Sequence, residues 1–187
     1  ISMMRAYYDK SKAKDFDNLF GSLWIGSHPT PLRNHYQVLY LDFSRILGNI
    51  DVLEEKFNSY CCDQLNDFID TYRDDYPKER VEEFLRSDDH GQKLNLLLNM
   101  SRKYNQPLYL IIDEYDNFTN IVLSEHGEAI YHNMTHASGF YREVFKKFKG
   151  MFERIFLTGV SPVTLDDLTS GFNIGWNVSM APELDKM

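Results

Sequence analysis

The stretch LYLIIDEYDN, residues 108–117, decides the fold of this 187-residue chain. Pro107 precedes it, and five apolar residues then run without alternation into the acids Asp113 and Glu114. A short, continuously apolar run of this kind predicts a strand that is covered on both faces. Residues 38–43 and residues 155–157 have the same character, so the sequence predicts three buried strands.

Long segments with helical spacing separate these runs. The spacing of apolar residues predicts two helices within residues 1–20, stopped at Gly21, and one over residues 51–73 with Asp51 as N-cap. Shorter helices are expected around residues 81–85 and 94–104, and a long one over residues 128–149, ended by Gly150. Helices between strands indicate parallel crossovers. The predicted class is therefore α/β, with a parallel sheet whose ligands bind beyond the carboxyl ends of the strands.

Acidic and hydroxyl residues follow the predicted strands. Four apolar residues before Asp113 and Glu114 form the pattern of a Walker B segment, in which the first acid fixes Mg²⁺ and the second polarises a water. The alternative is a strand that runs into a solvated acidic turn. Asp42 follows the first strand, where we favour a turn cap over a site residue.

Thr158 ends the third strand, 158 − 113 = 45 residues after Asp113. A small polar residue beside Walker B is where many ATPases place a group that senses the γ-phosphate. Ser161 is an alternative sensor, and an ordinary turn is the other interpretation, because Thr, Gly, Ser and Pro all favour turns. The pairing of this turn with the Asp-Glu segment favours the functional interpretation.

The charge composition of the chain limits the classes of partner that it is expected to bind. The net charge is 20 − 28 = −8, which makes nucleic acid a poor default partner, although Arg142, Lys146, Lys147 and Lys149 form a short basic stretch.

Cys61 and Cys62 are adjacent and are expected to pack in the core, which suits a reducing, cytoplasmic location. No apolar run approaches the roughly 18 residues of a membrane helix. His132 and His136 lie four apart, but Asn133 stands where a zinc protease needs Glu, so we expect a solvated helix face.

The runs SHPTPLRNHYQVLYLDFS, LYLIIDEYDNF and RIFLTGVSPVTLDDLTSGFNIG together resemble the AAA-ATPase-like family of bacterial proteins. In that family a P-loop ATPase region usually precedes a region that resembles PD-(D/E)XK nucleases. The resemblance implies a three-layer α/β/α P-loop-NTPase-like core that uses Mg²⁺ and ATP. It implies that Asp113 holds Mg-ATP through the metal, and that Glu114 and Thr158 are catalytic.

The sequence departs from the family at two points, since both the P-loop and the nuclease-like region are absent from it. It contains no G-x-x-x-x-G-K-[ST] motif, which the family places just before the helix that starts near Ile1. The chain also opens at Ile1 inside a helical pattern and stops at Met187 without an ending signal, so we expect residues 1–187 to be one domain truncated at both ends. Without the P-loop, this internal fragment is not expected to hydrolyse ATP alone. In the family's strand order, 5-1-4-3-2, the three strands are numbers 2, 3 and 4, and the P-loop strand is absent.

Two expectations follow from an absent P-loop strand. The outer edge of the strand at residues 154–158 would be exposed and could support self-association. A competing hypothesis is a degenerate, non-catalytic scaffold that positions a partner or a nuclease-like module, in some cases on nucleic acid. The upstream sequence separates the two, because an intact Gly-Lys loop favours the ATPase and a decayed loop favours the scaffold.

Overall fold

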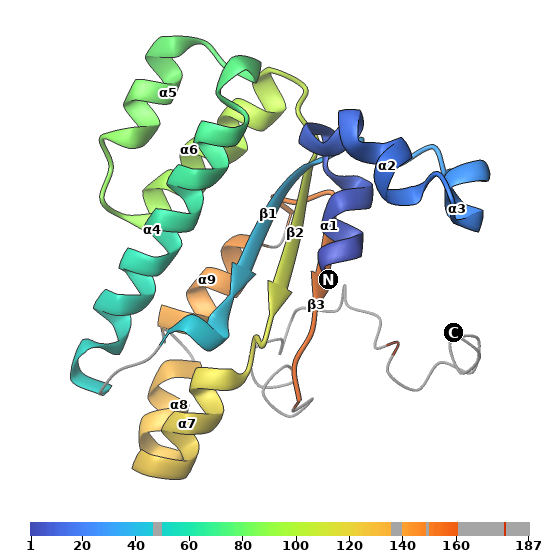
Figure 1. Cartoon of the computed structure of the whole chain (residues 1–187). Coiled ribbons are helices and arrows are strands. Elements are labelled where there is room, and N and C mark those ends of the chain that lie inside the picture. Colours follow the sequence, from blue (N-terminus) through green and yellow to red (C-terminus); the bar gives the residue numbers. More distant parts are fainter. Residues whose placement is uncertain (47–49, 136–139, 149, 161–177, 179–187) are drawn as a thin grey trace.

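A computed structural model describes residues 1–46, 50–135, 140–148, 150–160 and 178 of the chain. These residues form a three-stranded parallel sheet in the order β1-β2-β3, which confirms the predicted α/β class and the predicted neighbours. The strands are β1 (Gln37–Asp42), β2 (Leu108–Asp113) and β3 (Arg154–Leu157). Helices lie on both faces of the sheet, so the described residues form an incomplete α/β/α core (Figure 1).

The remaining elements follow the chain in a simple order (Figure 1). The α-helices are α1 (Ser2–Tyr8), α2 (Phe16–Phe20), α3 (Trp24–Ser27), α4 (Leu53–Thr71), α5 (Lys78–Leu85), α6 (His90–Lys103), α7 (Asn117–His126), α8 (Glu128–Thr135) and α9 (Phe140–Phe148). Short 3₁₀ turns occur at Lys10–Asp15, Phe43–Arg45, Ile50–Val52 and Arg73–Asp75. Among the described residues, no helix is both long and apolar enough to cross a membrane.

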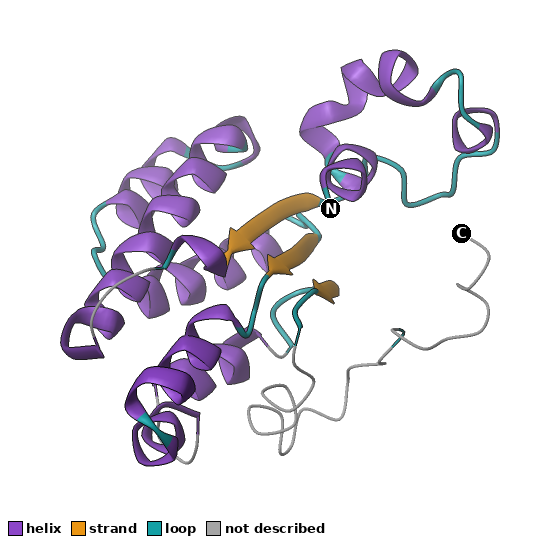
Figure 2. Cartoon of the chain, turned by 60° about the horizontal axis from the view of Figure 1, so that its bottom comes forward, coloured by secondary structure: helices purple, strands orange, loops and turns teal. Residues whose placement is uncertain are grey.

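Alternate residues of the strands divide the core into two layers. Leu39 and Leu41 of β1, with Leu110 and Ile112 of β2, join a large apolar cluster with the buried faces of α4, α5, α6 and α9. The intervening residues face the other way. Val38, Tyr109 and Ile111 pack against residues of α1 and neighbouring loops in a smaller cluster. Figure 2 shows this arrangement from one end, with the sheet between the α4–α6 group and the α1–α3 group.

Two sequence-based helix predictions need correction. Asp51 is not the N-cap of α4, because it lies inside the 3₁₀ turn Ile50–Val52 and Val52 precedes the helix. The expected single helix at residues 128–149 is two helices, α8 and α9. The apolar spacing is helical in both segments, so it does not separate them, and residues 136–139 between them lie outside the described residues. The predicted stop at Gly150 is confirmed by its φ of 78°, which suits glycine.

Tyrosine hydroxyls from the α4 region protect the outer edge of β1. The backbone amide of Val38 donates to the Tyr72 hydroxyl over 2.9 Å, and that of Asp42 donates to the Tyr60 hydroxyl over 2.6 Å. Tyr60 lies in α4, and burial raises its pKa to about 12. Buried strand amides need acceptors, and these hydroxyls supply them where no further strand pairs with β1 in the described part of the chain.

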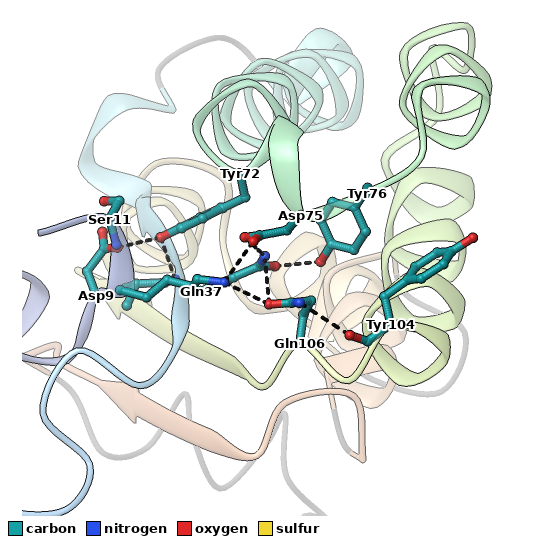
Figure 3. Close-up of polar contacts among 10 residues, drawn as sticks. Asp9, Ser11, Gln37, Tyr72, Asp75, Tyr76, Tyr104 and Gln106 are labelled. Atoms are coloured by element: carbon teal, nitrogen blue, oxygen red, sulfur yellow. Dashed lines mark hydrogen bonds and ion pairs between the residues drawn. The ribbon is translucent and has the colours of Figure 1, made fainter. Parts of the chain in front are cut away.

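A polar network continues from Tyr72 along the starting ends of the strands (Figure 3). Tyr72 donates in turn to Asp9, 2.8 Å away, and burial raises the pKa of Tyr72, with the Asp9 charge adding to the effect. The side chain of Gln37 is fully buried, accepts from Tyr76 over 2.5 Å and donates to Asp75 over 2.7 Å. This network joins the segment after α1 to α4 and to the first residue of β1.

We predict that Tyr72→Phe lowers the free energy of unfolding by about 1–3 kcal/mol, because the buried Val38 amide loses its acceptor while the ring is kept. Urea unfolding followed by circular dichroism measures the change. Tyr8→Phe is the matched control, since its ring packs on Tyr36 and Tyr109 but no hydrogen bond to its hydroxyl occurs within the described residues. A loss for Tyr72→Phe no larger than that of the control would show that the hydroxyl adds no stability.

Candidate functional site at the carboxyl edge of the sheet

The parallel strands bring three sequence-predicted residues to one edge of the sheet. Asp42 and Asp113 are register partners at the ends of β1 and β2. Leu157 of β3 is the partner of Ile112, so Thr158 follows at the height of Asp113. All three strands run toward this edge (Figure 1). The predicted meeting of Asp113 with Thr158, from segments far apart in sequence, is therefore present in the structure.

The Asp113 carboxylate is held from both neighbouring strands. The Thr158 hydroxyl donates to its Oδ1 over 2.5 Å. The Tyr40 hydroxyl, from β1, donates to its Oδ2 over 3.3 Å. Burial raises the pKa of Tyr40, and the negative charges of Asp42 and Asp113 raise it further, so this hydroxyl remains a donor at neutral pH. The Asp113 and Thr158 side chains are half-buried, which leaves this edge accessible to a ligand.

Tyr40 also connects the site to α1, a link that the sequence analysis missed. The Arg5 guanidinium lies 4.1 Å from the centre of the Tyr40 ring, a cation–π distance. Tyr8, one turn later, contacts Tyr36 and Tyr109 near the starts of β1 and β2. The helix α1 therefore runs antiparallel to the strands, and its first turn lies nearest the edge that carries Asp113.

Asp42 behaves as the turn cap that we favoured. Its carboxylate accepts from the Ser44 amide over 3.1 Å and from the Ser44 hydroxyl over 2.6 Å. It also forms an ion pair with Arg45 at 3.2 Å. These contacts turn its oxygens toward residues 44–45 and fix the bend after β1.

Glu114 occupies a strained backbone position. Its φ is +53°, in the left-handed region that residues other than glycine and asparagine seldom adopt. This backbone reverses the chain directly after β2, and the Asn117 amide then donates to the Glu114 carbonyl over 3.0 Å. Glu114 is half-buried beside Asp113. Strained residues of this kind cluster at functional sites, since the surrounding structure must hold them in place.

The turns after β2 and β3 are hydrogen-bonded to each other. The Tyr115 amide donates to the Thr158 carbonyl over 3.0 Å, and the Thr158 amide donates to the Ile112 carbonyl over 2.9 Å. The fully buried Asp116 carboxylate accepts from the Val160 amide at 3.1–3.2 Å. The role of Asp116 is not visible in the sequence, because its partner Val160 lies in a distant turn.

The donor set at this edge fits a magnesium ion that is bound mainly through phosphate. No group of three or more His, Cys, Asp or Glu side chains that could hold a metal occurs within the described residues. Magnesium in nucleotide sites is bound by one or two carboxylates, water and substrate phosphates, so the single carboxylate of Asp113 suffices. The residue that could hold the metal is therefore Asp113, with Thr158 and Tyr40 orienting its carboxylate.

The other sequence candidates lie away from this edge or outside the described residues. Cys61 and Cys62 are buried, free thiols on α4, and burial raises the pKa of both, which confirms the core-packing expectation. The side chain of His132 is exposed on α8, whereas His136 and Ser161 lie outside the described residues. Lys146 forms an ion pair with Glu143 at 2.5 Å on the surface of α9.

These observations define an α/β protein with a parallel sheet and an acidic site at the carboxyl edge of its strands. The AAA-ATPase-like family, described as "Predicted AAA-ATPase", matches residues 1–169. The chain belongs to this family, as the sequence resemblance predicted. Searches of curated proteins and of solved structures found no match.

We predict that Glu114→Gly raises the free energy of unfolding by about 1 kcal/mol, because relief of the left-handed strain outweighs the entropy that glycine loses on folding. Asn105→Gly is the matched control. Asn105 is exposed and also has a φ of +53°, but asparagine tolerates that conformation, so little or no gain is expected. Urea unfolding compares the two variants, and equal effects would mean that Glu114 is not strained.

Proposed function

We propose that this domain contributes the Walker B and sensor part of a Mg-ATP site and belongs to an ATPase. The observation that carries the proposal is the contact between the Asp113 carboxylate and the Thr158 hydroxyl at the tips of adjacent parallel strands. Parallel α/β sheets bind ligands at this edge. Membership of the AAA-ATPase-like family supports nucleotide and Mg²⁺ use in general.

Each site residue has a distinct role in the proposal. Asp113 holds the magnesium ion directly or through water, and Tyr40 and Thr158 keep its two oxygens oriented. Bound Mg²⁺ would neutralise charge on the phosphates. Glu114 leaves the strand at a different angle, because of its left-handed backbone, and orients the attacking water. Thr158 senses the γ-phosphate through the same hydroxyl that contacts Asp113.

The position of α1 supports the proposal. In the family the P-loop stands in front of this helix, and the Arg5–Tyr40 contact brings the first turn of α1 toward the edge that carries Asp113. A phosphate-binding loop at that point would face the Walker B acids. Residues 1–187 contain no Gly-Lys loop, so we propose that they do not hydrolyse ATP alone.

A second candidate function is the non-catalytic scaffold. It is favoured by the fact that both oxygens of Asp113 already accept hydrogen bonds from the protein's own side chains. An acid satisfied in this way needs no metal to be stable at this position. The scaffold would either position a nuclease-like module on nucleic acid or bind a second copy of the chain through β3. The exposed Arg154 and the half-buried residues after it in β3 support binding of a second copy.

The free, buried thiols of Cys61 and Cys62 suit a reducing compartment. We therefore propose a cytoplasmic location for the protein under both candidate functions.

The test is a calorimetric titration of the full-length protein with ATP, with and without Mg²⁺, followed by a phosphate-release assay. We expect micromolar, Mg-dependent binding. Glu114→Gln should keep binding and lose about 10²- to 10⁴-fold in turnover, because the water loses its general base. Asp113→Asn should lose the Mg²⁺ dependence of binding.

Asp42→Asn is the matched control for these variants. Asp42 is the register partner of Asp113, and asparagine can still cap its turn, so binding and turnover should match the wild type. Retained turnover in Glu114→Gln would reject the role of Glu114. Absence of Mg-ATP binding by the folded full-length protein would reject the ATPase proposal in favour of the scaffold.

A further inference from the structure

A buried carboxylate lies directly under the turn that carries Thr158. Asp116 is 0% exposed. Its Oδ1 and Oδ2 lie 3.2 and 3.1 Å from the Val160 amide nitrogen, and its Oδ2 also accepts from the Asn120 side-chain amide over 3.0 Å. A fully buried carboxylate is costly unless donors surround it. The turn after β3 and the first turn of α7 supply these donors.

Gly159 brings the turn into direct contact with this carboxylate. A Cβ atom added at Gly159 would lie 2.5 Å from Asp116 Oδ1 and 2.5 Å from the Tyr115 ring. Any larger residue would force the turn away from both groups. The absence of a side chain at Gly159 therefore lets the backbone approach close enough for the Val160 amide to reach Asp116.

Both backbone polar groups of Thr158, its amide and its carbonyl, form hydrogen bonds. Its amide donates to the Ile112 carbonyl and its carbonyl accepts from the Tyr115 amide. Two residues later, Asp116 holds the Val160 amide. Tyr115 itself is fixed from the far side, because the buried hydroxyl of Tyr141 on α9 donates to its carbonyl. The direction of the Thr158 hydroxyl toward Asp113 therefore depends on both turns keeping their positions.

We propose that Asp116 is a positioning residue that holds residues 158–160 in place, so that the Thr158 hydroxyl stays on the Asp113 carboxylate. Its role in turnover rests on the proposed ATPase function. Asp116 acts through hydrogen bonds and touches neither metal nor nucleotide. A carboxylate suits the position because only donors face it in these contacts, namely the Val160 amide and the Asn120 side chain.

Two variants disturb this contact from opposite sides. Asp116→Asn keeps the volume, but it replaces an acceptor oxygen with an NH₂ group and removes the charge. Gly159→Ala leaves every charge in place and pushes the turn away from Asp116. Asp75→Asn is the matched control, since Asp75 accepts from Gln37 and Lys10 in the network at the starting ends of the strands, away from Asp116.

The first readout is hydrogen exchange of the Val160 amide in the folded full-length protein. We expect exchange about tenfold or more faster in Asp116→Asn and in Gly159→Ala, and unchanged in Asp75→Asn, after correction for any common loss of global stability. Unchanged Val160 exchange in both variants would overturn the claim that Asp116 holds the turn. This readout does not depend on ATP.

The second readout is Mg-ATP turnover of the same proteins. Displacement of the Thr158 hydroxyl should lower kcat about 10- to 100-fold in both variants, with KM changed less than threefold, because misplacement acts on the chemical step. The double variant should lose little more than either single one, since both break the same contact. Wild-type kcat in a variant with accelerated Val160 exchange would overturn the role in turnover. A wild-type protein without turnover would reject the proposed function, and the exchange comparison would then decide the structural claim alone.

Discussion

Every residue of β2 from Leu108 to Ile112 is buried, so its backbone amides and carbonyls must all find partners inside the protein. Neighbouring strands on both sides satisfy them, and apolar layers on both faces cover its side chains. β1 and β3 supply the first requirement in fixed registers. The apolar faces of α4, α6, α9 and α1 supply the second. The height of Asp113 between its neighbours follows from this pairing.

The two ends of the sheet differ in how their polar groups are satisfied. At the starting end, Gln37 donates to Asp75, the Tyr72 hydroxyl accepts from the Val38 amide and donates to Asp9, and Gln37 has no solvent contact. At the carboxyl end, Asp113 and Glu114 stay half-buried, although neighbouring side chains hold Asp113. Asp75 is half-buried as well, and its two oxygens accept from Lys10 and Gln37. What distinguishes the carboxyl end is that an acid, a hydroxyl and the left-handed Glu114 follow adjacent parallel strands there, where α/β sheets bind ligands.

The sequence predicted the strands because buried parallel strands are continuous apolar runs, and it predicted parallel pairing because long helical segments between them indicate crossovers. The order of the strands was predicted from the family resemblance, and the structure has that order. The parallel pairing also predicted the Asp113–Thr158 meeting, since the carboxyl ends of parallel strands share one edge. The part of Tyr40 was not predictable, because it depends on the register of β1 against β2 and on the side to which residue 40 points. The role of Asp116 was not predictable either, because it is one of several neighbouring acids and its burial depends on the distant turn at Val160. The helix α7 was missed because its apolar pattern is short, and the N-cap of α4 was misplaced because a 3₁₀ turn precedes it.

The pairing of β1 with β2 has a consequence for the order of folding. Gln37 pairs with Leu108, 108 − 37 = 71 residues later, and the helices α4, α5 and α6 occupy the interval. Closing so long a loop costs entropy before any strand contact repays it. Helical contacts between α4 and α6 are more local and form faster. We therefore expect assembly of the sheet to be the slow step of folding, so that the acidic edge forms together with the last long-range contacts.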